Sequence, residues 1–422
     1  MAATAATAAP RRAADPAGLV RLLSPGDRVF LPGAGAEVPA LMNALCTPDA
    51  PPLHITASFV PGINPVPLER LPEGSTWSST FAPPTPAGSQ ATGRFRHLPM
   101  SYGVFASHLR GAEFDVGFVH VSPPDGQGVC SLGVAVEFTP IVLKRCRRVL
   151  AVVNPRMPRI PGAETVDLAC ADAVLELDSP LREYDVGAPS AQATRIAELI
   201  APFVADRSTL QVGLGKTPDA LMRMVADRRG LRLHSGMLSD AARLLADSGA
   251  LDASALHASC VHVGTAGYYD WLAGRDDFAV RACDFTHAAA TLAGLPRLVA
   301  VNSALSVDLF GQANLEMLDG RMVSGVGGAA DFAHAASLAP DGVSIIALPA
   351  ASGRSAVSRI TPRLEGVCSL PRHAIDVVVT EHGVADLRGL SVMDRAERLI
   401  AVAGPEHRGA LQDACKDIAA RL

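Results

Sequence analysis

The chain has 422 residues, of which 49% are hydrophobic and 19% are charged, and its formal net charge is −5. This length exceeds one ordinary hydrophobic core, so we expect two or three globular domains. The acidic balance argues against a nucleic-acid-binding protein, and no hydrophobic run approaches the ~20 residues that a membrane-spanning helix needs.

The eight cysteines include no Cys-x-x-Cys pair, and no His/Cys cluster has zinc-finger spacing. We therefore expect neither a disulfide framework nor a metal site. Residues 1–16 are rich in alanine and lack a compact hydrophobic region, which predicts a disordered N-terminal tail, although Arg11-Arg12 leaves a targeting segment as the alternative. The expectation is a cytoplasmic protein with no permanently bound cofactor.

Strand-like and helix-like segments alternate along the chain. Expected strands cover residues 28–31, 116–121, 149–153, 210–212, 344–348 and 376–379. Expected helices cover residues 39–46, a segment that opens at Pro218, and residues 329–339. Short hydrophobic strands separated by helices are typical of an α/β fold with mostly parallel sheets.

The sequence contains one internal similarity. Val29-Phe-Leu-Pro-Gly-Ala-Gly35 is followed by Pro-Ala-Leu-Met, and Leu210-Gln-Val-Gly-Leu-Gly215 is followed by Pro-Asp-Ala-Leu-Met. This repetition indicates two similar open α/β domains. The polar stretch 178–190 is the natural boundary, so we expect domains over residues 17–185 and 186–422.

A glycine-rich loop precedes the helix expected over residues 329–339. Gly325, Gly327 and Gly328 let backbone N–H groups turn toward one point and let a ligand approach the bare chain. At a helix N-terminus such a loop favours a phosphate or the oxyanion of a reacting carbonyl. A tight turn without a ligand is the alternative.

Two further loops have ambiguous motifs. Gly213-Leu-Gly215-Lys-Thr resembles part of a Walker phosphate loop, but that motif needs a glycine where this chain has Leu210. Nucleotide hydrolysis is thereby excluded in favour of a structural turn. The segment Val121-Ser-Pro-Pro-Asp-Gly-Gln-Gly128 follows a strand and is either a rigid loop or the border of a ligand crevice.

Glu381 directly follows the expected strand over residues 376–379. A carboxylate at the carboxyl end of a strand is well placed for acid–base chemistry. An ion pair with Arg388 is the alternative.

From about Gly26 to its C-terminus, the chain resembles the acetyl-CoA hydrolase/transferase family, which includes acetate, butyrate and 4-hydroxybutyrate CoA-transferases. The resembling segments, in chain order, are Val-Ser-Pro-Pro-Asp125 with Ser131-Leu-Gly133, Asn154-Pro-Arg-Met-Pro158, Gly213-Leu-Gly215 with Pro218-Asp-Ala, Asn302-Ser-Ala-Leu with Asp308-Leu, Ser324-Gly-Val-Gly-Gly328 with Asp331-Phe, and Thr380-Glu-His-Gly383 with Ala385-Asp-Leu-Arg-Gly389. The resemblance implies two similarly folded α/β domains, an active-site cleft between them, an acyl-CoA thioester as substrate, and a homodimer or higher homo-oligomer.

In that family, a glutamate in the pattern His-Ser/Thr-Glu-Met attacks the thioester and carries CoA as a glutamyl thioester. This chain has His234-Ser-Gly236-Met, so Gly236 stands where the resemblance places the nucleophile. The resemblance also assigns Asn302 to the neighbourhood of the thioester and Glu381 to the site. It assigns the loop Gly325–Gly328 to the thioester oxygen, and this loop and the turn Gly213-Leu-Gly215 are expected to contact CoA.

Three functions are compatible with this pattern. The first is hydrolysis, or direct transfer to a bound acceptor, with Glu381 or His234 as general base. The second is CoA transfer to a small carboxylic acid with a carboxylate from elsewhere as nucleophile. The third is an inactive acyl-CoA-binding protein. Hydrolysis comes first because water needs no second specific site.

Overall fold

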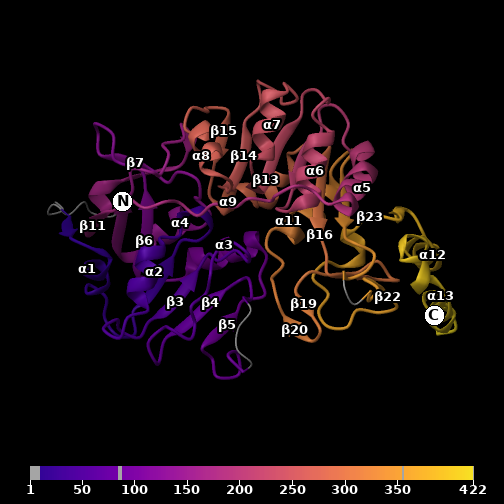
Figure 1. Cartoon of the computed structure of the whole chain (residues 1–422), viewed down its shortest axis with the longest axis horizontal. Coiled ribbons are helices and arrows are strands. Elements are labelled where there is room, and N and C mark those ends of the chain that lie inside the picture. The colour runs from indigo at the N-terminus through magenta and orange to yellow at the C-terminus, as the bar shows by residue number, and fades with distance from the viewer. Residues whose placement is uncertain (1–9, 84–87, 354–355, 422) are drawn as a thin grey trace. The chain divides into compact units, whose positions relative to one another are not determined.

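The computed structural model describes residues 10–83, 88–353 and 356–421 and divides the chain into two compact units (Figure 1). Unit 1 comprises residues 1–184 and 257–286, and unit 2 comprises residues 185–256 and 287–422. Within the described ranges, no helix is long and apolar enough to cross a membrane.

Unit 1 is built on an eight-stranded sheet with the order β1-β11-β8-β6-β2-β3-β4-β5, in which all neighbouring pairs are parallel. Its strands are β1 Arg11–Ala13, β2 Arg28–Leu31, β3 His54–Ala57, β4 Thr76–Ser79, β5 Phe95–His97, β6 Phe114–Val121, β8 Cys146–Val153 and β11 Ala173–Glu176. Its helices are α1 Pro16–Val20, α2 Pro39–Leu45, α3 Tyr102–Gly111, α4 Thr139–Leu143, α8 Ala266–Leu272 and α9 Cys283–Thr286, with 3-10 turns at Ala34–Ala36 and Leu168–Cys170. The central strands β6 and β8 are almost wholly hydrophobic toward their carboxyl ends because both faces of a parallel sheet are covered.

Unit 1 contains two smaller sets of strands. Strands β14 His257–His262, β15 Phe278–Val280 and β9 Gly162–Ala163 pair in parallel. Strands β7 Val129–Ser131 and β10 Thr165–Asp167 form an antiparallel pair. The pairing of β15 with β9 joins residues 257–286 to the preceding part of this unit.

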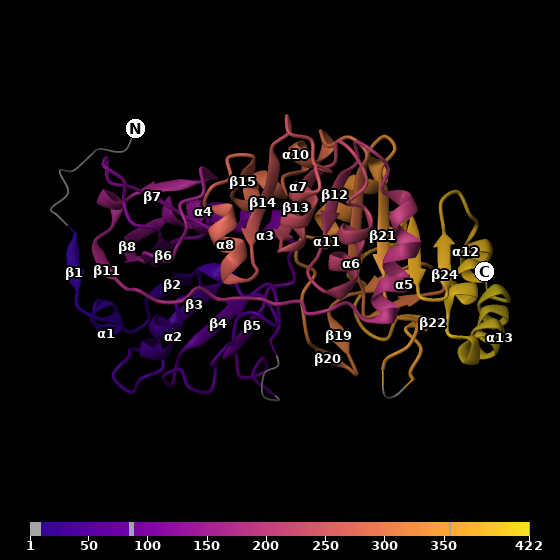
Figure 2. The same ribbon diagram turned by 45° about the horizontal axis from the view of Figure 1, so that its top comes forward.

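Unit 2 has a sheet with the order β24-β23-β21-β16-β12-β13, parallel except for the edge pair β23–β24. Its strands are β12 Thr209–Val212, β13 Arg232–Leu238, β16 Leu298–Ser303, β21 Val343–Ala347, β23 Val377–Thr380 and β24 Gly383–Asp386, with the short strands β17 Ser306–Asp308, β18 Ala313–Asn314, β19 Met317–Leu318, β20 Arg321–Met322 and β22 Ile360–Thr361 beside them. Its helices are α5 Ala191–Ile200, α6 Lys216–Met224, α7 Ala241–Asp247, α10 Ala289–Ala293, α11 Ala329–Leu338, α12 Val392–Val402 and α13 Arg408–Ala419, with 3-10 turns at Ala201–Phe203, Arg372–Ala374 and Pro405–His407. Figure 2 shows α5 and α6, which pack against each other, in front of this sheet.

The chain leaves β12 toward β13 on one side and leaves β16 toward β21 on the other. Crossovers between parallel strands are right-handed, so the two directions put α6 and α11 on opposite faces of the sheet. The direction in which the chain adds strands to the sheet therefore reverses between the neighbouring strands β12 and β16. Ligands of open α/β sheets bind outside the carboxyl ends of the strands at such a switch point.

The two units have the same arrangement around their first central strand. In unit 1, β2 lies between β3 and β6, and in unit 2, β12 lies between β13 and β16. Each of these strands runs into a glycine turn and then a helix, α2 or α6. The prediction of two similar α/β domains with mostly parallel sheets is confirmed by this arrangement.

The bounds of β2, β12, α2 and α11 agree with expectation to within one residue, whereas β8 begins three residues before the expected strand over residues 149–153. Two further details differ from expectation. Part of the tail predicted to be disordered is ordered: Arg11–Ala13 form β1, which pairs with β11, and the Arg12 guanidinium contacts the Glu176 carboxylate at 2.6 Å. The rest of that prediction, for residues 1–9, lies outside the described residues.

The second difference concerns the segment 257–286, which falls in unit 1, whereas the predicted domain over residues 186–422 included it. The pairing of β15 with β9 gives this segment hydrogen-bonded partners from residues 162–163. No local sequence pattern predicts this pairing. The predicted boundary near residue 185 otherwise stays a prediction.

Candidate functional site

The predicted site residues of unit 2 lie at the carboxyl ends of its parallel strands. Leu210 is paired with Leu233, and Val212 is paired with Val301. Continuing these registers puts Gly236, Gly213 and Asn302 at one level across three adjacent strands, and the Ser235 hydroxyl donates to the Val212 carbonyl at 2.7 Å. Three residues that are far apart in the sequence thus meet at the topological switch point.

Asn302 is fixed by a reciprocal pair of amide hydrogen bonds. Its Nδ2 donates to Gln211 Oε1 at 3.2 Å, and Gln211 Nε2 donates to Asn302 Oδ1 at 3.3 Å. Both side chains are buried. Each amide has both its oxygen and its nitrogen bonded, so Gln211, which the sequence motifs did not identify, holds the Asn302 side chain in place.

The turn after β12 requires glycine at one of its two predicted positions. Gly215 has φ +126° and caps the N-terminus of α6, a conformation that L side chains rarely adopt. At Gly213, by contrast, an added Cβ would meet nothing within 4 Å. Space is therefore open above the strand end at Gly213.

The glycine loop leads directly into α11, as expected. Gly327 has φ +54°, and Gly328 is the N-cap of the helix. The first N–H groups of a helix have no partner within it, so this end of α11 offers donors and the positive end of the helix dipole. The Ala329 N–H already donates to the Val326 carbonyl at 3.1 Å, and anion binding by the remaining N–H groups of the loop stays a prediction.

His287 connects the glycine loop with Gly236. A Cβ added at Gly328 would lie 2.4 Å from His287 Nε2, and a Cβ added at Gly236 would lie 3.2 Å from the same atom. The imidazole therefore occupies a notch between two residues that have no side chain. The sequence pattern gave no signal for His287, because nothing local reveals that Gly236 and Gly328 face one ring.

Phe332 of α11 supports both histidines of this region. The rings of His234 and His287 pack edge-on against it, with centroid distances of 6.1 Å and 5.0 Å. Both histidines are buried. Burial, with a contribution from the nearby His234, lowers the pKa of His287 to about 3, so its imidazole is neutral at physiological pH.

Glu381 follows β23 and is held by two hydrogen bonds. Gln192 Nε2 donates to its Oε1 at 2.8 Å, and the backbone N–H of Ala350 donates to its Oε2 at 2.9 Å. The expected alternative, a pair with Arg388, does not describe the structure, because the Arg388 guanidinium is 2.6 Å from Asp386. Glu381 is thus a fixed carboxylate at the same edge of the sheet, separated from β16 by β21.

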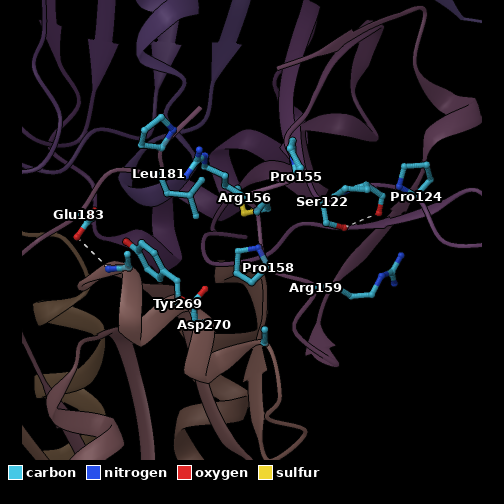
Figure 3. A pocket seen from close by; sticks show the side chains of 15 residues that line it. Ser122, Pro124, Pro155, Arg156, Pro158, Arg159, Leu181, Glu183, Tyr269 and Asp270 are labelled. Atoms are coloured by element: carbon cyan, nitrogen blue, oxygen red, sulfur yellow. Dashed lines mark hydrogen bonds between the residues drawn. The ribbon is translucent and has the colours of Figure 1, made fainter. Parts of the chain in front are cut away.

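Unit 1 contains a hollow of about 760 Å³ where two motifs of the resemblance meet (Figure 3). It is bordered by the loop Ser122–Pro124 after β6, the loop Pro155–Arg159 after β8, and one face of α8. The loop after β6 therefore borders a crevice. Its two arginines are already paired, Arg156 with Asp178 and Arg159 with Asp125.

A buried carboxyl in unit 1 was also missed by the sequence patterns. Glu137 is 2% exposed and accepts hydrogen bonds from the Ser58 hydroxyl and the Tyr102 phenol. Desolvation raises its pKa to about 7 despite these two donors. Its backbone has φ +41°, a strained conformation for a residue with a side chain.

Comparison with known proteins places both units in one family. The sequence model of the acetyl-CoA hydrolase/transferase N-terminal domain matches residues 75–181, and the model of the C-terminal domain matches residues 264–415. A 4-hydroxybutyrate coenzyme A transferase from Clostridium kluyveri is 34% identical over 310 residues, which cover 72% of each chain.

Two solved structures are similar over almost the whole length. RipA from Yersinia pestis has a TM-score of 0.87 and 27% identity, with 97% of this chain and 98% of the other covered. A 4-hydroxybutyrate CoA-transferase from Porphyromonas gingivalis has a TM-score of 0.78 and 26% identity, with 98% of each chain covered. These similarities agree with the fold class expected from the sequence.

Proposed function

The chain belongs to the acetyl-CoA hydrolase/transferase family, and we propose on that premise that it hydrolyses an acyl-CoA thioester without a covalent glutamyl intermediate. The family processes acyl-CoA, so the class of substrate follows from membership. The proposal concerns the step that opens the thioester.

The observation that carries the proposal is the surroundings of Gly236. The resemblance expects a nucleophilic glutamate at this position, and glycine has no group that can attack. The nearest side chain to an added Cβ belongs to His287, at 3.2 Å, and that side chain is no carboxylate. The His287 ring occupies the space beside Gly236, whereas the space above Gly213, at the same level of the sheet, is open, so we assign water, which is small, to that open space as the nucleophile.

In the proposed reaction, the oxygen of water attacks the thioester carbonyl carbon. N–H groups of the loop Gly325–Gly328 stabilise the oxyanion, and the Asn302 amide lies at the same edge. The C–S bond then breaks, and CoA leaves as a thiolate. Glu381, with His234 as the second candidate, takes the proton from water and a proton is returned to the sulfur.

CoA transfer to a carboxylic acid is the second candidate function. It is favoured by the name of the Clostridium kluyveri relative, a 4-hydroxybutyrate coenzyme A transferase. In that case the acceptor carboxylate attacks directly, or a carboxylate such as Glu381 serves as a non-standard nucleophile. Ping-pong kinetics with an acid acceptor would favour the covalent version.

The test is release of free thiol from a panel of acyl-CoA thioesters, with and without carboxylic acids. We expect release that does not depend on an acceptor. Mass spectrometry of enzyme mixed with substrate should detect no CoA adduct on a protein carboxylate, and such an adduct would refute the proposal. Tight CoA binding without turnover of any thioester would instead identify an inactive binding protein.

We further propose that the protein acts in the cytoplasm as a homodimer or higher homo-oligomer, as the resemblance implies. Light scattering of the purified chain measures the oligomeric state directly. A monomer at micromolar concentration would contradict this part of the proposal.

A further inference from the structure

A second hollow, in unit 2, lies between helices α10 and α11 and has a volume of about 480 Å³. This volume falls within the ~300–1,000 Å³ of ordinary ligand sites. Its lining residues are His287, Ala289, Leu292, Ala293, Ala330, Asp331, His334, Ala335, Leu338, Ala339 and Pro340. The motifs of the glycine loop and of the strand ends do not include the residues of α10 that line this hollow.

The lining is chemically simple. Small or aliphatic side chains dominate, and Asp331 and His334 are the polar residues besides His287. Among the described residues that line the hollow there is no lysine or arginine, and the Asp331 carboxylate would repel a phosphate. The pantetheine arm of CoA has two amides that need hydrogen-bond partners, whereas an alkyl chain needs none.

The hollow follows the length of α11. Asp331, Ala335 and Ala339 line it at intervals of four residues, which is the spacing of one helix face. Eight residues of helix span roughly 12 Å. At its outer end, the Leu338 side chain is 71% exposed, so the lining there is aliphatic and accessible to solvent.

The inner end of the hollow is lined by His287 and by Ala330 and Asp331, which follow Gly328 in the first turn of α11. His287 lines the hollow, and its Nε2 also lies in the notch formed by Gly236 and Gly328. A molecule seated in the hollow with its reacting end at His287 would therefore have that end beside the ring that contacts Gly236 and Gly328, next to the glycine loop.

We infer that the hollow between α10 and α11 binds the alkyl chain of the acyl group, with the thioester carbonyl at the His287 end. The inference rests on the proposed function for the identity of the ligand, and it names the substrates as acyl-CoA thioesters with unbranched aliphatic chains of medium length. Acetyl-CoA would leave most of the hollow unfilled.

One substitution and one matched control test this assignment. Ala293 lines the hollow and is exposed, so Ala293→Phe fills the hollow without disturbing the core. Ala290 is exposed on the same helix and is not a lining residue, so Ala290→Phe adds the same side chain elsewhere. Leu338→Asp, at the outer end, is a second variant that alters the lining at an exposed position.

The measurement is calorimetric binding of S-alkyl-CoA thioethers, which cannot be hydrolysed, together with free thiol release from the matching acyl-CoA series. Wild type should gain about fourfold in affinity per added methylene up to the length of the hollow. Ala293→Phe should remove this gain without changing the affinity for S-methyl-CoA, and Leu338→Asp should reduce it for the longest chains. Ala290→Phe should behave as wild type.

The outcomes separate the two proposals. Affinity that is independent of chain length in wild type, or equal behaviour of Ala293→Phe and Ala290→Phe, would overturn the assignment of the hollow even if thiol is released. A chain-length gain that Ala293→Phe removes, without any thiol release, would support the hollow and refute hydrolysis.

Discussion

The notch around His287 makes a quantitative prediction about Gly328→Ala. The new Cβ would lie 2.4 Å from Nε2 and 2.7 Å from Cδ2 of His287, whereas non-bonded carbon atoms prefer about 3.5–4.0 Å. The imidazole must therefore move by about 1 Å or more. It is buried against Phe332, so we expect an overpacking cost of about 1–3 kcal/mol.

Gly236→Ala is the matched milder change. Its Cβ would lie 3.2 Å from Nε2 and 3.4 Å from Cε1 of the same ring, so a shift of a few tenths of an ångström suffices. We expect a cost below about 1 kcal/mol. The loss of stability is therefore expected to be larger for Gly328→Ala than for Gly236→Ala, because the Cβ at position 328 comes closer to the ring.

Urea denaturation of single and double variants with His287→Ala isolates this steric effect. Gly328 is a helix N-cap, where alanine is itself less favourable, and the double-mutant cycle subtracts that contribution. We expect a coupling of about 1–3 kcal/mol between positions 328 and 287 and a smaller coupling between 236 and 287. A coupling below about 0.5 kcal/mol at 328 would refute the placement of the ring.

Further predictions concern Glu137, Asn302 and a second substitution at Gly236. Glu137 has its pKa raised from 4.5 to about 7, so the protonated carboxyl contributes stability that is complete below pH 4.5 and is lost as the pH rises through 7. Glu137→Gln should flatten this loss, about 3 kcal/mol at most, in urea melts at pH 5 and pH 8, and an unchanged slope would contradict the burial argument. Asn302→Ala strands the buried amide of Gln211, and we expect about 1–3 kcal/mol of destabilisation, with a non-additive double variant as the check. Gly236→Glu alone should form no CoA adduct because the His287 ring fills the space, whereas the double variant with His287→Ala should form one, as mass spectrometry can show; an adduct with the single variant would contradict this account.

Much of the fold was predictable from local pattern. Strands such as β8 and β23 contain uninterrupted hydrophobic runs, and the two glycine turns after β2 and β12 repeat in sequence and in topology. Patterns of this kind depend on neighbouring residues alone. Pairing between segments that are distant in the sequence depends on residues far from each strand. The pairing of Arg11–Ala13 with β11 and the pairing of β15 with β9 therefore could not be predicted from local pattern.

The candidate site also contains both residues that short sequence motifs identify and residues that only the fold identifies. The glycine loop before α11, Gly236 and Asn302 carry signals in short motifs, and the registers bring Gly236 and Asn302 to one edge of the sheet. His287 carries none, since its role depends on two glycines 92 residues apart in the numbering that face one ring. Glu137 likewise carries no signal in its own segment, because its burial and the donors Ser58 and Tyr102 come from remote segments.

The most direct test of the central claim is a single turnover of an acyl-CoA thioester in water enriched in oxygen-18. If water attacks the thioester carbonyl, the released acid carries one labelled oxygen in the first turnover, and no protein carboxylate is labelled. If a protein carboxylate attacks instead, that carboxylate gives one of its own unlabelled oxygens to the acid, and the label appears in the protein. The account predicts the labelled acid, and an unlabelled acid with a labelled protein would contradict it.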